Sequence, residues 1–244
     1  MIWTAACIPL GIFLSWLLVW VINRIPAKWL CDYGEEPSEE LLSGKRVCFQ
    51  KEGIITAFIF CIGLVMCRLQ FNKGFDIYFI VFAMIIFFAV MTAVCDIKYM
   101  IIPDQVLIFF GVILALIKVA IGYFNEEYES LIDAGYELFF LLYNGAFMFF
   151  ILYFIKAIGD YFGKKDTMGY GDVKMMFFVS MFLGWKISCF VVFFAAFLSL
   201  PACSIAMLRN SKQTMIAFGP YLAMSTIIFY LLKIDLNTIL DYIK

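Results

Sequence analysis

Long apolar runs alternate with short polar connections along the whole of this 244-residue chain. A helix needs about 20 apolar residues to cross the hydrocarbon core of a bilayer. By that measure the pattern predicts eight membrane spans, at residues 2–22, 54–69, 75–95, 105–123, 138–158, 173–185, 187–208 and 215–232. The spans at 54–69 and 173–185 are short, and short segments are found where backbone lines a protein cavity instead of lipid. The chain is therefore predicted to be an all-α, polytopic membrane helix bundle with about eight transmembrane helices.

The connections between the spans carry an orientation signal, because Lys and Arg accumulate in cytosolic loops. With the N-terminus outside, the inner connections hold twelve Lys and Arg residues and the outer connections hold six. Both termini are therefore predicted to lie outside. In this orientation Asp96, at the end of the third span, and Asp172, at the start of the sixth, both lie on the cytosolic side.

Composition narrows the function classes. Hydrophobic residues make up 65% of the chain and charged residues 15%, which excludes an ordinary soluble domain. The net charge of −1 and the lack of a broad basic patch give no reason to expect a nucleic-acid partner. Histidine is absent, so Ser-His and Cys-His catalysis and the His-containing zinc-protease motifs are excluded. Six of the eight cysteines fall in or at the ends of apolar spans, where cysteine behaves as a small hydrophobe.

Two aspartates at the mouths of membrane spans are the strongest candidates for chemistry. Asp172 stands in the stretch Gly169-Tyr170-Gly171-Asp172-Val173-Lys174, and Asp96 ends a long apolar run. Ionisable side chains at membrane depth are costly and so are candidates for function. Two neighbouring carboxylates share a proton, and the pair can activate water against a peptide carbonyl. Asp96 alone is equally well explained as a helix-end charge that reaches the interface with Lys98.

The residues beside these aspartates suggest supporting roles. Gly169 and Gly171 allow close approach and unusual backbone dihedrals, and Lys174 favours an ionised Asp172 if it points the same way. Asp104 is expected to cap the fourth span. Gly219-Pro220 interrupts the last span, either as a plain kink or as a break that receives an extended substrate.

Other charged residues are expected to be solvated. They are Asp160 and Asp166, together with the polar loop 26–53, which contains Glu35, Glu36, Glu39 and Glu40 beside Lys45 and Arg46.

In their order along the chain, these motifs resemble the type IV prepilin leader peptidases, which are intramembrane aspartic proteases of the G-x-G-D type. The matching pieces are Asp96 through Ile102-Pro103-Asp104, the stretch 169–174 leading to Leu183-Gly184, and Phe218-Gly219-Pro220-Tyr221-Leu222-Ala223. Gly11-x-Phe13-Leu14 followed by Arg24-Ile25-Pro26 resembles the N-terminal segment of the family.

The resemblance implies that Asp96 and Asp172 are the catalytic pair of a peptidase in the bacterial cytoplasmic membrane. It implies cleavage of the basic leader of prepilins and pseudopilins at the cytosolic face, without a cofactor. It also implies an N-terminal region, residues 1–72, that supports N-methylation with S-adenosylmethionine, followed by a peptidase bundle at 73–244. The family usually carries two C-x-x-C pairs in its first loop, a zinc pattern. Here only Cys31 and Cys48 occur there, so no metal site is expected and methylation is in question.

Two alternatives use the same features. A small transporter or channel could bind a cation or relay protons through paired aspartates, although its carboxylates should lie nearer the bilayer midplane. A presenilin-like protease shares the Gly-x-Gly-Asp logic, but Cys95 precedes Asp96 where such enzymes carry tyrosine. The leader-peptidase reading is favoured, with prepilin-like substrates and membrane lipid as partners.

Overall fold

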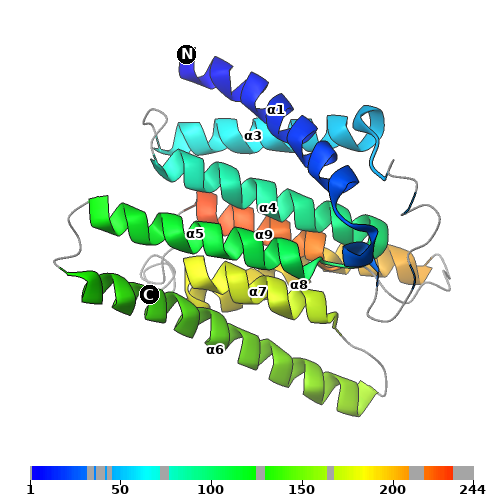
Figure 1. Ribbon diagram of the computed structural model, residues 1–244. Helices are drawn as coiled ribbons and strands as arrows, with labels where there is room; N and C mark the ends of the chain where they lie inside the picture. Colours follow the sequence, from blue (N-terminus) through cyan, green and yellow to red (C-terminus); the bar gives the residue numbers. More distant parts are fainter. Residues whose placement is uncertain are drawn as a thin grey trace, which may run out of the picture. The chain divides into compact units, whose positions relative to one another are not determined.

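The computed structural model describes residues 2–31, 36, 42, 46–71, 77–124, 130–163, 168–208 and 217–232. Within these ranges the chain is helical and contains no strand. The α-helices are α1 (Ile2–Arg24), α3 (Ile54–Phe71), α4 (Ile77–Tyr99), α5 (Asp104–Phe124), α6 (Leu131–Gly163), α7 (Tyr170–Leu183), α8 (Trp185–Leu208) and α9 (Gly219–Leu231), with the short turns η1 (Ala27–Leu30) and η2 (Phe49–Gly53) (Figure 1). Each predicted span corresponds to one α-helix, so the all-α prediction is confirmed.

The helices fall into two length classes. Six of those described are long and apolar enough to cross a membrane, which makes the chain a multi-pass membrane protein. Helix α7, with 14 residues, and α9, with 13, are shorter. At a rise of about 1.5 Å per residue each reaches only about 20 Å, less than the ~30 Å hydrocarbon core. By contrast the 33-residue α6 is about 50 Å long and must extend beyond the core at one or both ends.

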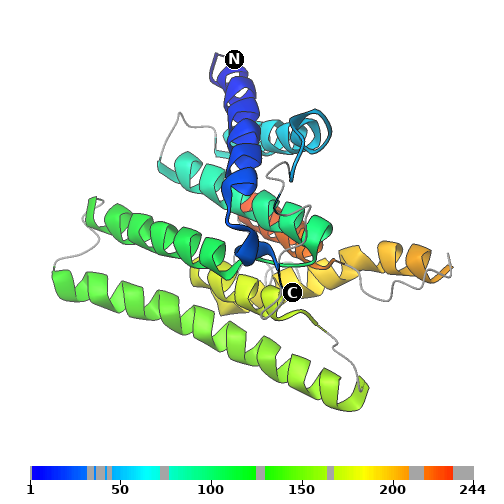
Figure 2. The same ribbon diagram turned by 45° about the vertical axis from the view of Figure 1, so that its right-hand side comes forward.

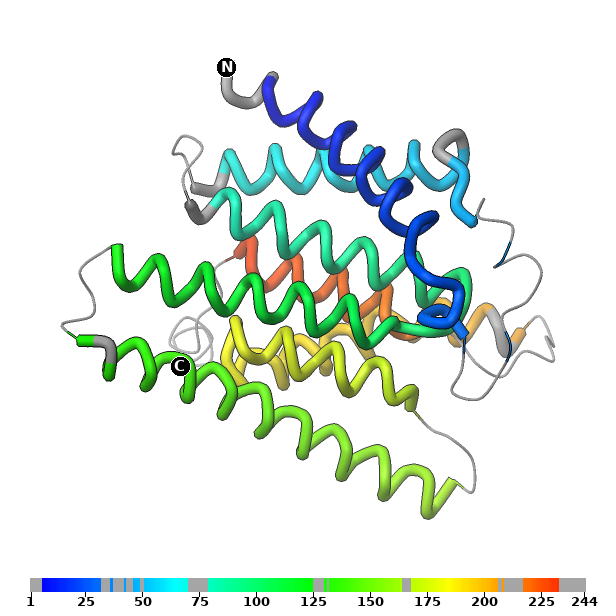
Figure 3. The backbone as a smooth tube through the Cα atoms, viewed as in Figure 1, coloured from blue at the N-terminus to red at the C-terminus, as the bar shows by residue number. Residues whose placement is uncertain are grey.

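The chain forms two compact units, Met1–Pro103 and Asp104–Lys244. The first contains α1, α3 and α4, and the second contains α5 to α9; Figure 3 follows the chain through both. This division comes after the helix that carries Asp96. The division predicted after residue 72 separates a methylation-related region from the peptidase bundle. It concerns function, not packing, and stays a prediction.

In the first unit, α1 crosses α3 obliquely, and a glycine sets their closest approach (Figures 1 and 2). A Cβ atom on Gly11 would lie 2.6 Å from Cys61 Sγ and 2.9 Å from the Cys61 backbone nitrogen. Small residues at helix crossings allow this close packing in membranes. Further along, Ser15 Oγ donates to the Gly53 carbonyl oxygen at 2.6 Å and lies 2.7 Å from Thr56 Oγ1. The crossing is thus close and also hydrogen-bonded.

Gly11→Ala is expected to destabilise the protein by about 1–3 kcal/mol, because backbone atoms of Cys61 cannot move aside cheaply. Gly135→Ala is the matched control, since a Cβ atom there meets nothing within 4 Å. The control should be neutral or stabilising by up to about 1 kcal/mol through helix propensity. Thermal unfolding of the purified variants in mild detergent measures both effects, and equal stabilities would contradict the prediction.

In the second unit, α5 and α6 both pack against α7, again at glycines. A Cβ atom on Gly111 of α5 would lie 2.1 Å from the Phe178 ring. One on Gly145 of α6 would lie 3.0 Å from both the ring and the carbonyl oxygen of Phe177. The two neighbouring phenylalanines of α7 are therefore held by glycines on different helices.

The end of α7 is fixed by a tight turn into α8. Gly184 has φ +81°, a left-handed conformation that only glycine adopts without strain. Its N–H donates to the Ser180 carbonyl oxygen at 2.9 Å, and the next N–H, of Trp185, donates to Asn144 Oδ1 at 3.3 Å. Ser180 Oγ in turn donates to the Asn144 carbonyl oxygen at 2.9 Å. Helix α6 thus anchors the end of α7 through one buried asparagine.

Candidate active site

Asp172 lies in the first turn of α7, three residues after the Gly169 N-cap position, and is buried with 7% exposed. On α7 it shares a face with Met176 and Val179, which are also buried. The positive end of the helix dipole favours a negative charge at this position. Burial therefore disfavours the ionised form of the Asp172 carboxyl group, whereas the helix dipole favours it.

The predicted role of the two glycines is only partly correct. Gly169 has φ −65° and ψ 138°, an ordinary extended conformation, and Gly171 lies inside the helix. The expectation of unusual dihedrals is therefore wrong; among the described glycines, a positive φ occurs at Gly184. Gly169 does lie beside the carboxylate: a Cβ atom there would lie 3.4 Å from Asp172 Oδ2, which is an ordinary van der Waals contact. A side chain at position 169 would cover that carboxylate oxygen with a hydrocarbon group.

Lys174 does not serve Asp172 in the way the sequence suggested. Two residues along a helix correspond to a rotation of about 200°, so Lys174 lies on the face of α7 opposite Asp172. Its Nζ forms an ion pair with Asp104 Oδ2 of α5 at 2.5 Å. Asp104 lies in the first turn of α5, where an acid is also favoured by the helix dipole. The expected capping residue therefore also joins the starts of two helices.

A buried lysine beside Tyr170 is the main feature that sequence reasoning missed. Lys156 of α6 is only 2% exposed; its Nζ lies 2.9 Å from Asp160 Oδ2 and 4.5 Å from the Tyr170 ring centroid. Asp160 is thus ion-paired, and the expectation that it is simply solvated is wrong; Asp166 lies outside the described residues. A cation over an aromatic ring is attracted to its π face. Lys156 therefore fixes Tyr170, the first residue of α7, against α6. The sequence did contain a signal for this pair, because Lys156 stands four residues before Asp160 and residues with this spacing are neighbours on a helix.

In the first unit, Asp96 lies in the last turn of α4 and is buried, with 7% exposed. Its own carbonyl oxygen accepts the N–H of Met100 at 2.9 Å, and Met100 has φ 54°. This is the left-handed ending of a helix, in which glycine is the usual residue. A methionine there costs about 1–2 kcal/mol of backbone strain. Helix α4 therefore ends in a strained turn at Met100, four residues after Asp96.

Met100→Gly is expected to stabilise the protein by about 0.5–1 kcal/mol, because the relieved strain exceeds the entropic cost of glycine. Met66→Gly is the matched control: both methionines are 53% exposed, but Met66 lies within α3. The control should lose about 1 kcal/mol. Unfolding of the two variants in the same detergent checks the opposite signs, and destabilisation by Met100→Gly would refute the role of the turn.

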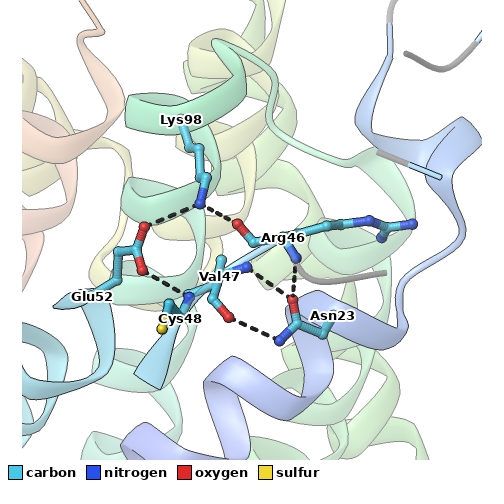
Figure 4. A network of polar contacts seen from close by, with 6 residues as sticks. All are labelled: Asn23, Arg46, Val47, Cys48, Glu52 and Lys98. Atoms are coloured by element: carbon cyan, nitrogen blue, oxygen red, sulfur yellow. Dashed lines mark hydrogen bonds and ion pairs between the residues drawn. The ribbon is translucent and has the colours of Figure 1, made fainter. Parts of the chain in front are cut away.

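A polar network joins the ends of α1 and α4 to residues 46–52 (Figure 4). Asn23 Oδ1 accepts the N–H groups of Arg46 at 2.8 Å and Val47 at 2.9 Å, while Asn23 Nδ2 donates to the Val47 carbonyl oxygen at 3.0 Å. Lys98 Nζ lies 3.0 Å from Glu52 Oε1 and also donates to the Arg46 carbonyl oxygen. Glu52 Oε2 accepts the N–H of Cys48 at 2.8 Å.

This network changes the interpretation of the first loop. Arg46 is 9% exposed and donates to the carbonyl oxygens of Ile22 and Ile25, so it is not a solvated loop charge as expected. Glu36 is exposed, in agreement with the expectation, while Glu35, Glu39, Glu40 and Lys45 lie outside the described residues. Lys98, two residues after Asp96, is bound to this loop and does not merely extend toward the interface. The loop therefore holds the end of α4.

Asp96 belongs to the first compact unit and Asp172 to the second. Each is buried near a helix end, as expected for acids with a function. The pairing of the two carboxylates stays a prediction.

The family model for the type IV leader peptidase family matches residues 82–204 of this chain. The chain belongs to this family. The matched segment contains Asp96, Asp104 and Asp172, and family membership favours a peptidase over the transporter alternative. No curated protein and no solved structure matches the chain.

Gly219 and Pro220 lie beyond the segment matched to the leader peptidase family, and the structure overturns the expectation of a plain kink. Helix α9 begins at Gly219, with Pro220 in its first turn. Proline is favoured there because its missing N–H and fixed φ suit the first turn. The pair therefore starts a helix and does not kink one. The short length of α9 follows from this start.

The part of the leader-peptidase chain that the structure describes shows no cluster of metal-binding groups. Among the described residues, no three Cys, Asp or Glu side chains lie close enough together to hold an ion. Cys31 Sγ donates to the Lys28 carbonyl oxygen at 3.4 Å, and Cys48 is exposed. The catalytic roles of Asp96 and Asp172 and the supporting roles of Gly169, Gly171, Lys174, Asp104, Gly219 and Pro220 stay predictions.

Proposed function

We propose that this protein is an intramembrane aspartic endopeptidase that removes the leader from prepilins or pseudopilins at the cytosolic face of the bacterial cytoplasmic membrane. The observation that carries the proposal is that the leader-peptidase segment contains two buried aspartates at helix ends, Asp96 and Asp172. The absence of histidine from the chain removes the most common alternative base.

The proposed reaction needs one ionised and one protonated carboxyl group. The ionised aspartate takes a proton from water, and the resulting hydroxide adds to the carbonyl carbon of the scissile bond. The protonated aspartate donates its proton to the carbonyl oxygen, which stabilises the charge that develops there. Collapse of the tetrahedral intermediate breaks the C–N bond: the first aspartate gives its proton to the leaving amine, and the second takes one back from a hydroxyl group of the intermediate. One carboxylate and one acid remain, ready for the next turnover.

The proposed substrate has a short basic leader followed by an apolar helix. The Lys and Arg distribution supports a cytosolic reaction, because it puts the starts of α5 and α7 and the end of α4 on the inner side. A bond cut there lies at the boundary between the leader in the cytosol and the helix in the lipid. N-methylation of the new N-terminus with S-adenosylmethionine is the second activity of the family, and its usual cysteine pairs are reduced here to Cys31 and Cys48.

One assay tests both activities. Membranes containing the full chain are mixed with a prepilin and labelled S-adenosylmethionine, and the product is scored for shortening and for label. Shortening that persists with a chelator present is the expected result. If the prepilin stays intact while an established leader peptidase shortens it in parallel, the proposed function is wrong. Label on the shortened product would show that methyl transfer survives without the two cysteine pairs.

A further inference from the structure

A pocket of about 310 Å³ opens between α5, α6 and α7 in the second unit. Its apolar lining consists of Leu107, Ile108, Phe149, Phe177 and Phe178. Its polar end is the Asp104–Lys174 ion pair. Asp104 is the first residue of α5 and Lys174 the fifth of α7, and the apolar residues mostly lie about one turn further on. The pocket therefore changes from charged to apolar in the direction that runs into the membrane.

The walls of this pocket are fixed by close packing. The ring of Phe178 lies on Gly111, and the ring of Phe177 lies on Gly145, each within the distance that a Cβ atom would need. Neither ring can move toward its glycine helix to close the cavity. Close helix packing therefore fixes one side of each ring that lines the pocket.

The pocket is separate from the candidate catalytic site. Lys174, Phe177 and Phe178 lie on one face of α7, and Asp172 with Met176 and Val179 lies on the other. The diameter of a helix with its side chains is about 10–12 Å, so a group in the pocket does not reach the Asp172 carboxylate from that face.

We propose that this pocket binds a membrane phospholipid with a zwitterionic ethanolamine headgroup. One acyl chain occupies the apolar part. The phosphate accepts hydrogen bonds from Lys174 Nζ, and the ammonium group donates to the Asp104 carboxylate. The adjacent positive and negative side chains match a headgroup that carries both charges, whereas a purely anionic headgroup would be repelled by Asp104. Side-chain exposures of 36% for Lys174 and 25% for Asp104 leave both groups accessible.

The sequence of groups along the pocket, a charged end followed by an apolar stretch, matches a lipid headgroup followed by its acyl chain. The proposal does not depend on the peptidase activity.

The test uses the full chain, purified in mild detergent and depleted of lipid. Thermal unfolding and native mass spectrometry measure binding of four probes: phosphatidylethanolamine, phosphatidylglycerol, diacylglycerol and soluble glycerophosphoethanolamine. Ile108→Trp fills the mouth of the pocket, and Phe109→Trp is the matched control. Both residues are exposed, at 56% and 62%, and Ile108 lines the pocket while Phe109 is not part of its lining. Unfolding without added lipid verifies that both variants are folded.

Added phosphatidylethanolamine is expected to bind the wild type and Phe109→Trp equally, and to bind Ile108→Trp about tenfold more weakly. In the wild type it should also bind about tenfold more tightly than the other three probes. This comparison needs no variant, so the test holds even if Ile108→Trp does not fold. Equal binding of phosphatidylglycerol or diacylglycerol, or equal effects of the two tryptophan variants, would overturn the proposal. Displacement of the lipid by an unprocessed prepilin would also overturn it and assign the pocket to the substrate.

Discussion

Asp96→Asn and Asp172→Asn are each expected to lower the rate of leader cleavage by about 10³-fold or more, while the protein stays folded in the membrane. Asparagine has nearly the shape of aspartate but can neither take a proton from water nor donate an acidic proton. If both carboxyl groups act in one reaction, the double variant should be little worse than either single variant. Initial cleavage rates of purified variants with one prepilin substrate give the measurement.

Asp104→Asn is the matched control for this experiment. Asp104 also lies at a membrane helix end and inside the matched family segment, but it forms the ion pair with Lys174 on the face of α7 away from Asp172. Loss of this ion pair should mainly lower the free energy of unfolding. The cleavage rate should fall less than about tenfold. Full activity of Asp172→Asn or Asp96→Asn would remove the proposed mechanism, whatever the control shows.

Lys156→Met is expected to be the most destabilising single change of a charge in the second unit, by about 1–3 kcal/mol. The lysine is 2% exposed, and methionine fills similar space without the charge. The change removes the ion pair with Asp160 and the cation over the Tyr170 ring. The estimate is below the usual cost of breaking a fully buried pair because Asp160 is 29% exposed. Because Tyr170 starts the helix that carries Asp172, the turnover rate should fall as well.

The controls separate a positioning role from general loss of stability. Lys156→Arg keeps the positive charge and should retain most of the turnover rate with little change in KM. Lys118→Met removes the cation of another pair in this unit, Lys118–Glu137 at 3.1 Å, which is more exposed and should contribute at most about 1 kcal/mol. A double-mutant cycle of Lys156→Met with Asp160→Asn gives the coupling energy of the pair. If Lys156→Met and Lys118→Met lower the free energy of unfolding equally, the burial of Lys156 has no energetic consequence.

Several features of the candidate site could not be predicted from the sequence. Lys174 looked like a partner of Asp172 because they are neighbours in sequence, but helix rotation turns it toward Asp104, 70 residues away. Asp160 looked solvated because it stands in a polar stretch, but α6 continues to Gly163 and places it one turn from Lys156. Asn23 gave no signal, because its role depends on the backbone of residues 46 and 47 lying beside it.

The sequence by itself determined the helical class, the apolar spans that form α1 and α3 to α9, and the two candidate acids Asp96 and Asp172. The physical reason is that lipid offers no partners for backbone N–H and C=O groups, so every long apolar run must satisfy them within its own helix. Only the tertiary structure decided which charges meet and that a pocket lies behind α7. These depend on which helix faces approach each other, and that is set by contacts such as Gly111 with Phe178 and Gly145 with Phe177. Side-chain packing between helices, unlike hydrophobicity along them, is not written in any one segment.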